Sequence, residues 1–174
     1  SVAMSADGTR IAIGSRDGGP NLEGQVRVFT WSGTTWTQTG LDINGETAGD
    51  ESGTSVAMSR DGTRIAIGAP SNNSNAGHVR VYTLTNGAWT KTGVDIDGEA
   101  TGDLSGGAVA MSASGTHIAI GAKSNRSLRG QVRVYEVLAS PIAPTISSLT
   151  PANGSLTVAF TPGTDGGSAI TNYK

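Results

Sequence analysis

The stretch Val56-Ala-Met-Ser-Arg-Asp-Gly-Thr-Arg-Ile-Ala-Ile-Gly68 decides the fold, because nearly the same residues occur three times in the chain. The other copies run from Val2 to Gly14 and from Val109 to Gly121, so the copies are spaced by 54 and then 53 residues. A second block follows each copy at a constant spacing of 53 residues: Gln25-Val-Arg-Val-Phe29, His78-Val-Arg-Val-Tyr82 and Gln131-Val-Arg-Val-Tyr135. A period of about 50 residues is typical of repeat architectures. The extra residue of the first copy lies between the two blocks, in a segment that we interpret as a loop because loops tolerate insertions.

Each repeat contains four segments with strand character, which in the middle repeat are 55–59, 64–68, 78–82 and 88–96. Asp61-Gly62 follows the first segment and Asn86-Gly87 precedes the fourth, and both dipeptides favour two-residue hairpin turns. The second segment is small and apolar on both faces, which predicts a strand packed on each side. No window carries apolar residues at helical spacing. Each repeat is therefore predicted to be a four-stranded antiparallel meander.

Four strands in about 50 residues, with abundant glycine, favour a blade of a β-propeller, in which neighbouring sheets bury each other's apolar faces. We therefore expect an all-β fold with a partial β-propeller of about three four-stranded antiparallel blades, over residues 1–54, 55–107 and 108–138. A β-solenoid is the alternative, but its rungs are usually shorter and lack hairpin turns. The third blade is incomplete, because its repeat lacks the segment that carries Trp36 and Trp89 in the others. The rest of the propeller would then be needed for closure.

The composition changes after the third repeat. Residues 139–144 contain prolines at 141 and 144 and are expected to form a stiff linker. Residues 145–174 look like the opening of a fibronectin type III domain, with Leu156, Val158 and Phe160 alternating along one strand. About 30 residues supply only the first strands of a β-sandwich that normally needs about 100. We therefore expect the chain to be a piece of a longer protein.

Composition excludes several functional classes. The chain has 174 residues, 36% of them hydrophobic, and a net charge of −2, so it is neither a disordered tail nor a basic surface that attracts nucleic acid. It has no cysteine, which excludes disulfides, thiolate metal sites and a cysteine nucleophile. No apolar run approaches the ~18 residues of a membrane span, so no membrane insertion is expected within this segment. No Gly-x-Ser-x-Gly elbow and no Ser/His/Asp set can be assembled, so we predict that the chain is not an enzyme.

The repeats resemble a known family. The run 49–70, followed by 77–82, is similar to the FG-GAP repeats of integrin α-subunit-like propellers in a divergent form, over roughly residues 1–138. Ile67-Gly-Ala-Pro70 matches the family's GAP element, and Ser52-Gly53 stands where the family has Phe-Gly. The resemblance implies a secreted or surface-displayed protein. Family members that bind calcium do so in a loop between the first two strands, which here keeps at most one carboxylate, so the resemblance implies that this calcium site is lost.

Candidate ligand-binding residues lie in the loops between the second and third strands of each repeat. These loops and the connectors that lead from the fourth strand to the next repeat should emerge at one end of the sheets. The loop candidates are Asn21, Asn72, Asn73, Asn75, Asn125 and Arg126. Trp31 does not recur in the other repeats, so it is a candidate for stacking on a sugar, whereas Trp36 and Trp89 recur and are expected to pack.

A connector supplies the candidate metal site. Asp95, Asp97, Glu99 and Asp103 fall within nine positions, a spacing compatible with an oxygen-ligated cation such as Ca²⁺. The full twelve-residue calcium-loop pattern is absent, and capping and solubility explain the same carboxylates. No other cofactor is expected. Arg27, Arg80 and Arg133 recur in register, which predicts a row of exposed arginines that discourages edge pairing.

Together these features predict a non-catalytic extracellular or cell-surface binding and adhesion module that displays variable loops on a propeller scaffold. Its partner would be a protein or glycan ligand. Two alternatives remain open at this point: an accessory domain of a secreted carbohydrate-active enzyme, and a passive structural spacer of an envelope or matrix protein.

Overall fold

The computed structural model describes residues 1–137, 145–152 and 155–161. The chain divides into two compact units, Ser1–Val137 and Leu138–Lys174. The predicted linker 139–144 and the sequence from 162 onward lie outside the described residues. The described part is all-β, with several antiparallel sheets of which none closes on itself, so the expected fold class is confirmed at this level.

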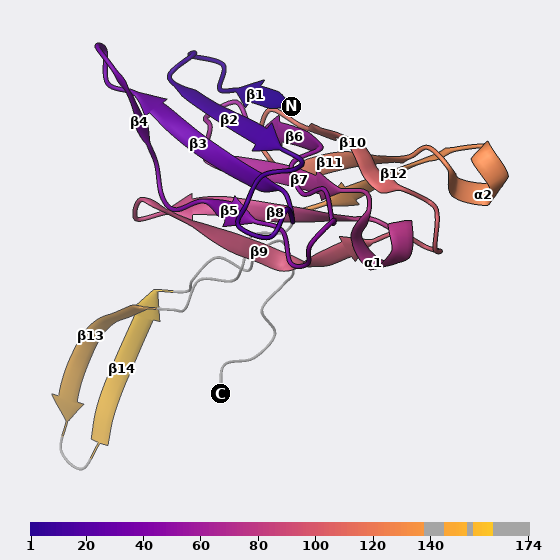
Figure 1. Ribbon diagram of the computed structural model, residues 1–174. Coiled ribbons are helices and arrows are strands. Elements are labelled where there is room, and N and C mark those ends of the chain that lie inside the picture. The colour runs from indigo at the N-terminus through magenta and orange to yellow at the C-terminus, as the bar shows by residue number, and fades with distance from the viewer. Residues whose placement is uncertain (138–144, 153–154, 162–174) are drawn as a thin grey trace. The chain divides into compact units, whose positions relative to one another are not determined.

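Three sheets follow one another along the first unit (Figure 1). The first contains β1 (Val2–Met4), β2 (Arg10–Ser15), β3 (Gln25–Trp31), β4 (Trp36–Gln38) and β5 (Ile43–Asn44). The second contains β6 (Ser55–Met58), β7 (Arg64–Ala69), β8 (His78–Thr85) and β9 (Ala88–Asp97). The third contains β10 (Ser105–Met111), β11 (His117–Ala122) and β12 (Gln131–Glu136), and the short helices α1 (Asn72–Asn75) and α2 (Asn125–Leu128) precede β8 and β12. In the second sheet, strands adjacent in the sequence pair antiparallel, as the meander prediction requires, whereas in the first sheet β4 and β5 both pair with β3.

The turns differ in how closely they follow the prediction. Asn86 and Gly87 both have positive φ, 51° and 81°, and Thr85 pairs with Ala88, so this is a two-residue hairpin. The Asp61-Gly62 prediction was wrong in length, because residues 59–63 connect β6 to β7 and only Gly62 has positive φ. The Asp61 carboxylate closes this longer turn by accepting hydrogen bonds from Ser59 Oγ at 2.6 Å and from the Thr63 amide at 3.0 Å.

The first turn of the chain is built in the same way. Asp7 accepts hydrogen bonds from Ser5 Oγ at 2.7 Å and from the Thr9 amide at 2.9 Å. The hydrogen bonds from Ser5 and then from Thr9 lower the pKa of Asp7 to about 2. Asp7 and Asp61 therefore act as turn residues.

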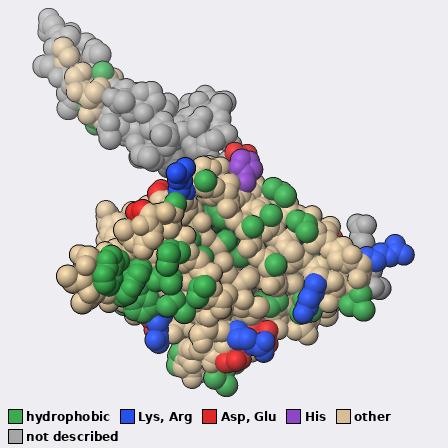
Figure 2. Space-filling model, turned by 90° about the horizontal axis from the view of Figure 1, so that it is seen from above, with side chains coloured by type: hydrophobic (Ala, Val, Ile, Leu, Met, Phe, Trp, Pro, Cys, Tyr) green, Lys and Arg blue, Asp and Glu red, His purple; other side chains and the backbone are tan. Residues whose placement is uncertain are grey.

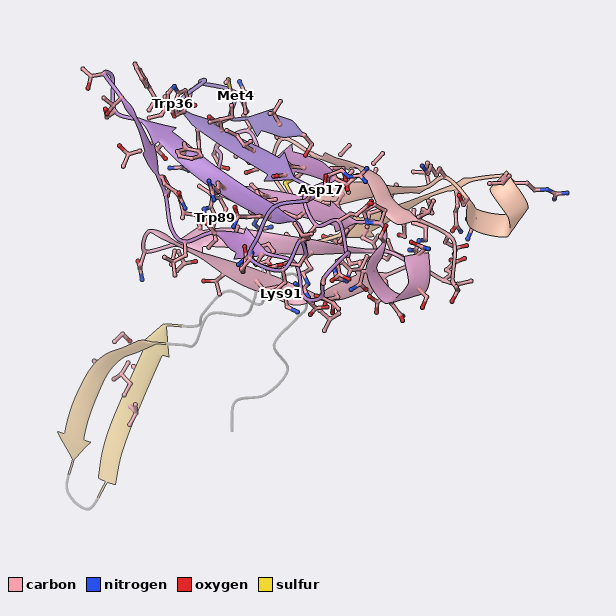
Figure 3. The ribbon with its side chains drawn as sticks, in the orientation of Figure 1. Met4, Asp17, Trp36, Trp89 and Lys91 are labelled. Atoms are coloured by element: carbon pink, nitrogen blue, oxygen red, sulfur yellow. The ribbon has the colours of Figure 1, made fainter. Side chains whose placement is uncertain are left out.

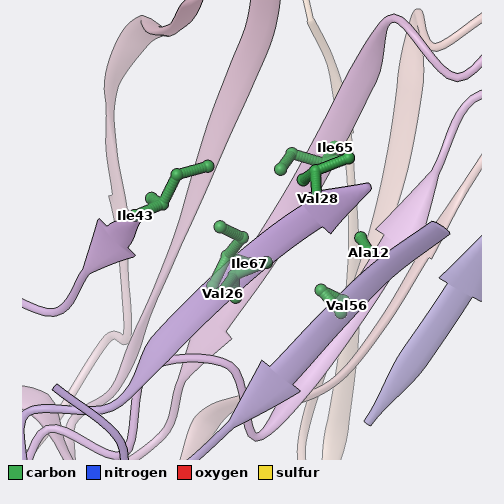
Figure 4. Packing of buried hydrophobic residues seen from close by; sticks show 7 residues of the cluster. All are labelled: Ala12, Val26, Val28, Ile43, Val56, Ile65 and Ile67. Atoms are coloured by element: carbon green, nitrogen blue, oxygen red, sulfur yellow. The ribbon is translucent and has the colours of Figure 1, made fainter. Parts of the chain in front are cut away.

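The sheets stack on one another through two hydrophobic clusters. We call the face of a sheet that packs on the next sheet its leading face, and the face that packs on the preceding sheet its trailing face. Ala12, Val26, Val28 and Ile43 on the leading face of the first sheet pack against Val56, Ile65 and Ile67 on the trailing face of the second (Figure 4). The second cluster joins Ala66, Val79 and Val81 to Ile118 and Ile120 of the third sheet. The same interface is thus built twice, one repeat apart.

Glycines let the stacked sheets approach closely. A Cβ on Gly68 of β7 would lie 2.0 Å from the carbonyl oxygen of Gly106 in β10, and a Cβ on Gly14 would lie 2.2 Å from that of Gly53. Hydrogen bonds cross at the same level, from Ser1 Oγ to Gly53 O at 2.8 Å and from Ser55 Oγ to Gly106 O at 2.7 Å. The glycine of the second strand is therefore the contact point between successive sheets.

The predicted row of exposed arginines is wrong for the middle and third repeats, because the Arg133 side chain is only 16% exposed and its guanidinium donates to Asp97 O at 2.7 Å. Arg80 is buried, and its guanidinium contacts Glu46, from the connector that follows the first sheet, and Asp95 of β9. Arg27, in the first sheet, has a mostly exposed side chain. The sequence pattern of one repeat could not show this difference, because the neighbouring repeat supplies the acidic partner.

The second unit contains one described hairpin. β13 (Thr145–Ala152) pairs antiparallel with β14 (Ser155–Thr161). The strand predicted from Leu156, Val158 and Phe160 is confirmed as β14. The strand expected from Ile170 to Lys174 lies outside the described residues.

Candidate functional site

The loops and connectors gather at one end of the stack, as predicted. His78, the first residue of β8, pairs with Asp97, the last residue of β9. The loop before β8 and the connector after β9 therefore leave the second sheet side by side. In Figure 1 this is the end that carries α1.

A recurring carboxylate–amide pair ties each connector to the loop of the next sheet. Asp50 is buried, and one oxygen of its carboxylate accepts hydrogen bonds from the Thr47 amide at 2.9 Å and from Asn72 Nδ2 at 3.0 Å. Asp103 is buried in the same way and accepts from the Ala100 amide and from Asn125 Nδ2, both at 2.9 Å. The separation is 22 residues in both cases. The anchor is therefore a repeated feature, and of the four residues the sequence analysis had singled out Asn72, Asn125 and Asp103 for other roles.

The loop tip of the second repeat has an unusual backbone. Asn73, Ser74 and Asn75 all have φ between 50° and 65°, in the left-handed region, and all three are exposed. Backbone hydrogen bonds hold this turn, from the Ala76 amide to Asn73 O at 3.1 Å and from the Gly77 amide to Asn72 O at 3.0 Å. Two of the predicted ligand-binding residues, Asn73 and Asn75, thus project from a strained tip, whereas Asn72 lies in its base.

The remaining loop candidates are placed differently. Asn21 is exposed, and its backbone amide donates a hydrogen bond to the Glu23 carboxylate at 2.8 Å. Asn125 is buried in the base of its loop, and its Oδ1 has no hydrogen-bond partner among the described residues. The side chain of Arg126 lies outside what the structure describes. Trp31 is at the opposite end of β3 from the loops, and its ring lies 5.5 Å from that of Trp36, centroid to centroid.

A polar cavity of about 580 Å³ lies between the first connector and the second loop. Carboxylates, amides and hydroxyls provide most of its walls: Glu46, Thr47, Asp50, Ser71, Asn72, Asn73, Ser74, His78, Asp95 and Asp97. The cavity therefore joins residues of two repeats. It contains the anchor Asp50–Asn72 and one exposed tip residue that the sequence analysis selected, Asn73.

Three residues of this cavity form the tightest group of possible metal ligands in the described residues. The ligand atoms of Glu46, His78 and Asp95 all lie within 4.8 Å of one another. Arg80 already contacts both carboxylates, and Lys91 Nζ lies 2.8 Å from the Asp95 carboxylate. A cation would have to displace these positive groups, so the geometry fits an internal ion-pair network better than a metal centre.

The four connector carboxylates proposed from the sequence point to different partners. Asp95 pairs with Arg80 and Lys91, and Asp103 belongs to the anchor with Asn125. Glu99 lies 3.8 Å from Arg133, and Asp97 is exposed at the cavity wall. In the described part of the chain, no contact brings these four carboxylates together around one ion position, and calcium binding by them stays a prediction. The sequence analysis did not select Glu46, His78 or Asp50, although the 22-residue recurrence of the anchor was visible in the sequence.

Burial controls the charge of His78. Desolvation lowers the pKa of its imidazole, against the opposing influence of Asp95, Asp50 and Asp97. A lowered pKa means that the unfolded chain binds this proton more readily than the folded chain. Protonation therefore costs stability, and the cost grows as the pH falls below the unfolded histidine pKa of about 6.5.

We expect His78→Gln to reduce the loss of stability between pH 6.5 and pH 5. Glutamine occupies the equivalent positions 25 and 131, where the Gln25 amide donates to Asp42 at 3.0 Å, so the substitution suits the site. Urea unfolding at several pH values measures the effect, and His117→Gln, at an exposed histidine of β11, is the matched control. If both variants keep the wild-type pH dependence, His78 is not the group responsible.

Comparisons with known proteins add no relatives. No protein-family model matches the chain, and a search of curated proteins finds no significant match. Among the described residues, no helix has the length and apolar character needed to cross a bilayer.

Proposed function

We propose that this chain is a non-catalytic binding and adhesion module that acts outside the cell or at the cell surface. The stacked sheets are blades of a partial β-propeller related to FG-GAP repeats, and the C-terminal segment is the opening of a fibronectin type III domain. A protein or glycan ligand is held by several modest polar contacts from loops that the scaffold keeps in place.

The strained tip of the loop 72–77 is the observation that carries this proposal. The left-handed region costs an ordinary residue roughly 1–2 kcal/mol, and asparagine tolerates it mainly as a single residue, whereas Asn73, Ser74 and Asn75 occupy it consecutively. Such strain persists where the surroundings impose it, and it is concentrated at functional sites. Here the anchor Asp50–Asn72 and the backbone bonds of the turn impose it. A tip that is already ordered gives up less entropy when it binds a ligand.

The chemistry of the cavity supports a polar ligand. The amide of Asn73, the hydroxyls of Ser71 and Ser74 and the carboxylate of Asp97 provide both donors and acceptors. Sugar hydroxyls and peptide groups match such a set, because each needs a donor and an acceptor close together. Two of the exposed tip residues, Asn73 and Ser74, border the cavity, so one ligand can contact the tip and the cavity together.

The proposal is tested with the full chain on an array of glycans and matrix proteins. The double variant Asn73→Gly, Asn75→Gly removes two tip side chains, and glycine tolerates the positive φ of both positions. We expect selective binding to the array by the wild type and at least a tenfold loss of affinity in the variant. The matched control is Asn86→Gly, because Asn86 is also exposed with positive φ but lies at the opposite end of β8.

Each other outcome contradicts the proposal in its own way. Binding that the tip variant retains would place the ligand elsewhere. Turnover of a glycan would indicate an accessory role in a carbohydrate-active enzyme, and no binding to any probe would favour a passive spacer.

A further inference from the structure

The two ends of the stack expose faces that are buried inside it. Val79 and Val81, on the leading face of the second sheet, are 0% and 3% exposed. The equivalent residues of the third sheet, Val132 and Val134, are 71% and 67% exposed. No sheet of the described residues covers this leading face.

The trailing face of the first sheet is open in the same way. Ile13 is 41% exposed, whereas its equivalent in the second sheet, Ile67, is 2% exposed. Val2 and Met4 of β1 are also exposed, as is Trp36 of β4. Figure 2 views the molecule from the side on which β1 and β4 lie and shows hydrophobic side chains across that face, and Figure 3 shows Met4 and Trp36 along its edge.

In a closed propeller the remaining blades would cover these two faces; in this chain we propose that the two faces bind each other between two copies, head to tail. The occupant follows from the interfaces inside the stack, where each leading face is covered by the trailing face of the next sheet. The open leading face of the third sheet repeats the valines that Ile118 and Ile120 cover one sheet earlier. The open trailing face of the first sheet supplies the same kind of cover, because Ile11 and Ile13 are equivalent to Ile118 and Ile120.

Two further features of the internal interfaces continue at the ends. Within the stack, the Ala6 amide donates to Arg60 O and the Arg60 amide donates to Ala113 O, both at 2.9 Å. If the series continues, the next hydrogen bond is donated by the Ala113 backbone amide to Ala6 O of a second copy. A hollow of about 510 Å³ on the third sheet is lined by Gly121. Gly121 is equivalent to Gly68 of β7, which the backbone of the third sheet approaches closely inside the stack. The open face thus keeps the space that a neighbouring backbone fills inside the stack.

The contact joins two different surfaces, so it does not close when two copies have met. Each added copy leaves one leading face and one trailing face free, and the assembly grows into a chain or a ring. This inference depends on the sheet faces and not on the ligand proposed for the loop end.

Analytical ultracentrifugation of the full chain tests the proposal. We expect the mean mass of the wild type to rise at least twofold with concentration. Val134→Lys blocks the leading face and Met4→Lys blocks the trailing face, and both residues are exposed, so neither substitution removes core packing. Each variant alone should remain monomeric, because it keeps only one of the two faces that the contact needs.

Mixing the two variants distinguishes this contact from others. The intact trailing face of one variant and the intact leading face of the other should form a dimer that grows no further. Val94→Lys is the matched control, because Val94 is an exposed valine of the second sheet, outside both open faces, and this variant should associate as the wild type does. A wild type that is monomeric at all concentrations, or a Val134→Lys variant that still associates alone, would overturn the proposal.

Discussion

Gly68→Ala should destabilise the first unit by about 3 kcal/mol, the upper part of the range for overpacking a protein interior. The added Cβ would lie 2.0 Å from the carbonyl oxygen of Gly106 and 2.5 Å from Ser55 Oγ. The carbonyl oxygen belongs to the backbone of the next sheet, so the clash is relieved only if the second and third sheets move apart. Equilibrium unfolding in urea measures the change in the free energy of unfolding.

Gly121→Ala is the matched control for this prediction. Gly121 has the same place in the third repeat, but the nearest heavy atom to its added Cβ is Ala108 Cβ, at an ordinary 3.5 Å. The alanine reduces the entropy of the unfolded chain, so we expect stability to stay the same or to rise by at most about 1 kcal/mol. Equal effects of the two substitutions would show that the second and third sheets do not stack as described.

Ile67→Ala should cost about 3 kcal/mol, within the range of 2–5 kcal/mol for truncating a buried isoleucine. Ile67 packs between the second sheet and the leading face of the first, in the cluster with Val26 and Val28. Ile13→Ala removes the same atoms at the equivalent position of the first sheet, where the side chain is partly in water, and should cost about 1 kcal/mol or less.

Unfolding of the two isoleucine variants is compared at a concentration at which the chain is monomeric, so that only internal contacts count. A cost for Ile13→Ala as large as that for Ile67→Ala would mean that the trailing face of the first sheet is already covered within one chain.

The repeat made most of the local structure predictable. Strand positions followed from the recurring blocks, and the two-residue turn followed from Asn86-Gly87, because that dipeptide adopts positive φ at both residues at little cost. The prediction failed at Asp61-Gly62, where the aspartate side chain closes a longer turn instead. An aspartate or asparagine before glycine can close a turn with side-chain hydrogen bonds or adopt positive φ. The dipeptide sequence alone does not predict which of the two occurs.

The candidate site was less predictable, because its residues come from two repeats. The prediction that the loops and the connectors emerge at one end of the sheets was correct, because antiparallel meanders place alternate connections at one end. The burial of Arg80 depends on Glu46, and the cavity depends on how the first connector meets the second loop. A pattern confined to one repeat carries no information about either. The anchor pairs Asp50–Asn72 and Asp103–Asn125 are the exception, because their equal spacing crosses from one repeat to the next.

The sheets stack in series, each leading face on the next trailing face. Nuclear Overhauser effects between selectively labelled methyl groups, in the full chain carrying Val134→Lys, test it most directly. We predict cross-peaks from Val26 and Val28 to Ile65 and Ile67, and from Val79 and Val81 to Ile118 and Ile120, with none from Val132 to any methyl of the first sheet. Absence of the first two sets, in a chain that is folded and monomeric, would contradict the account.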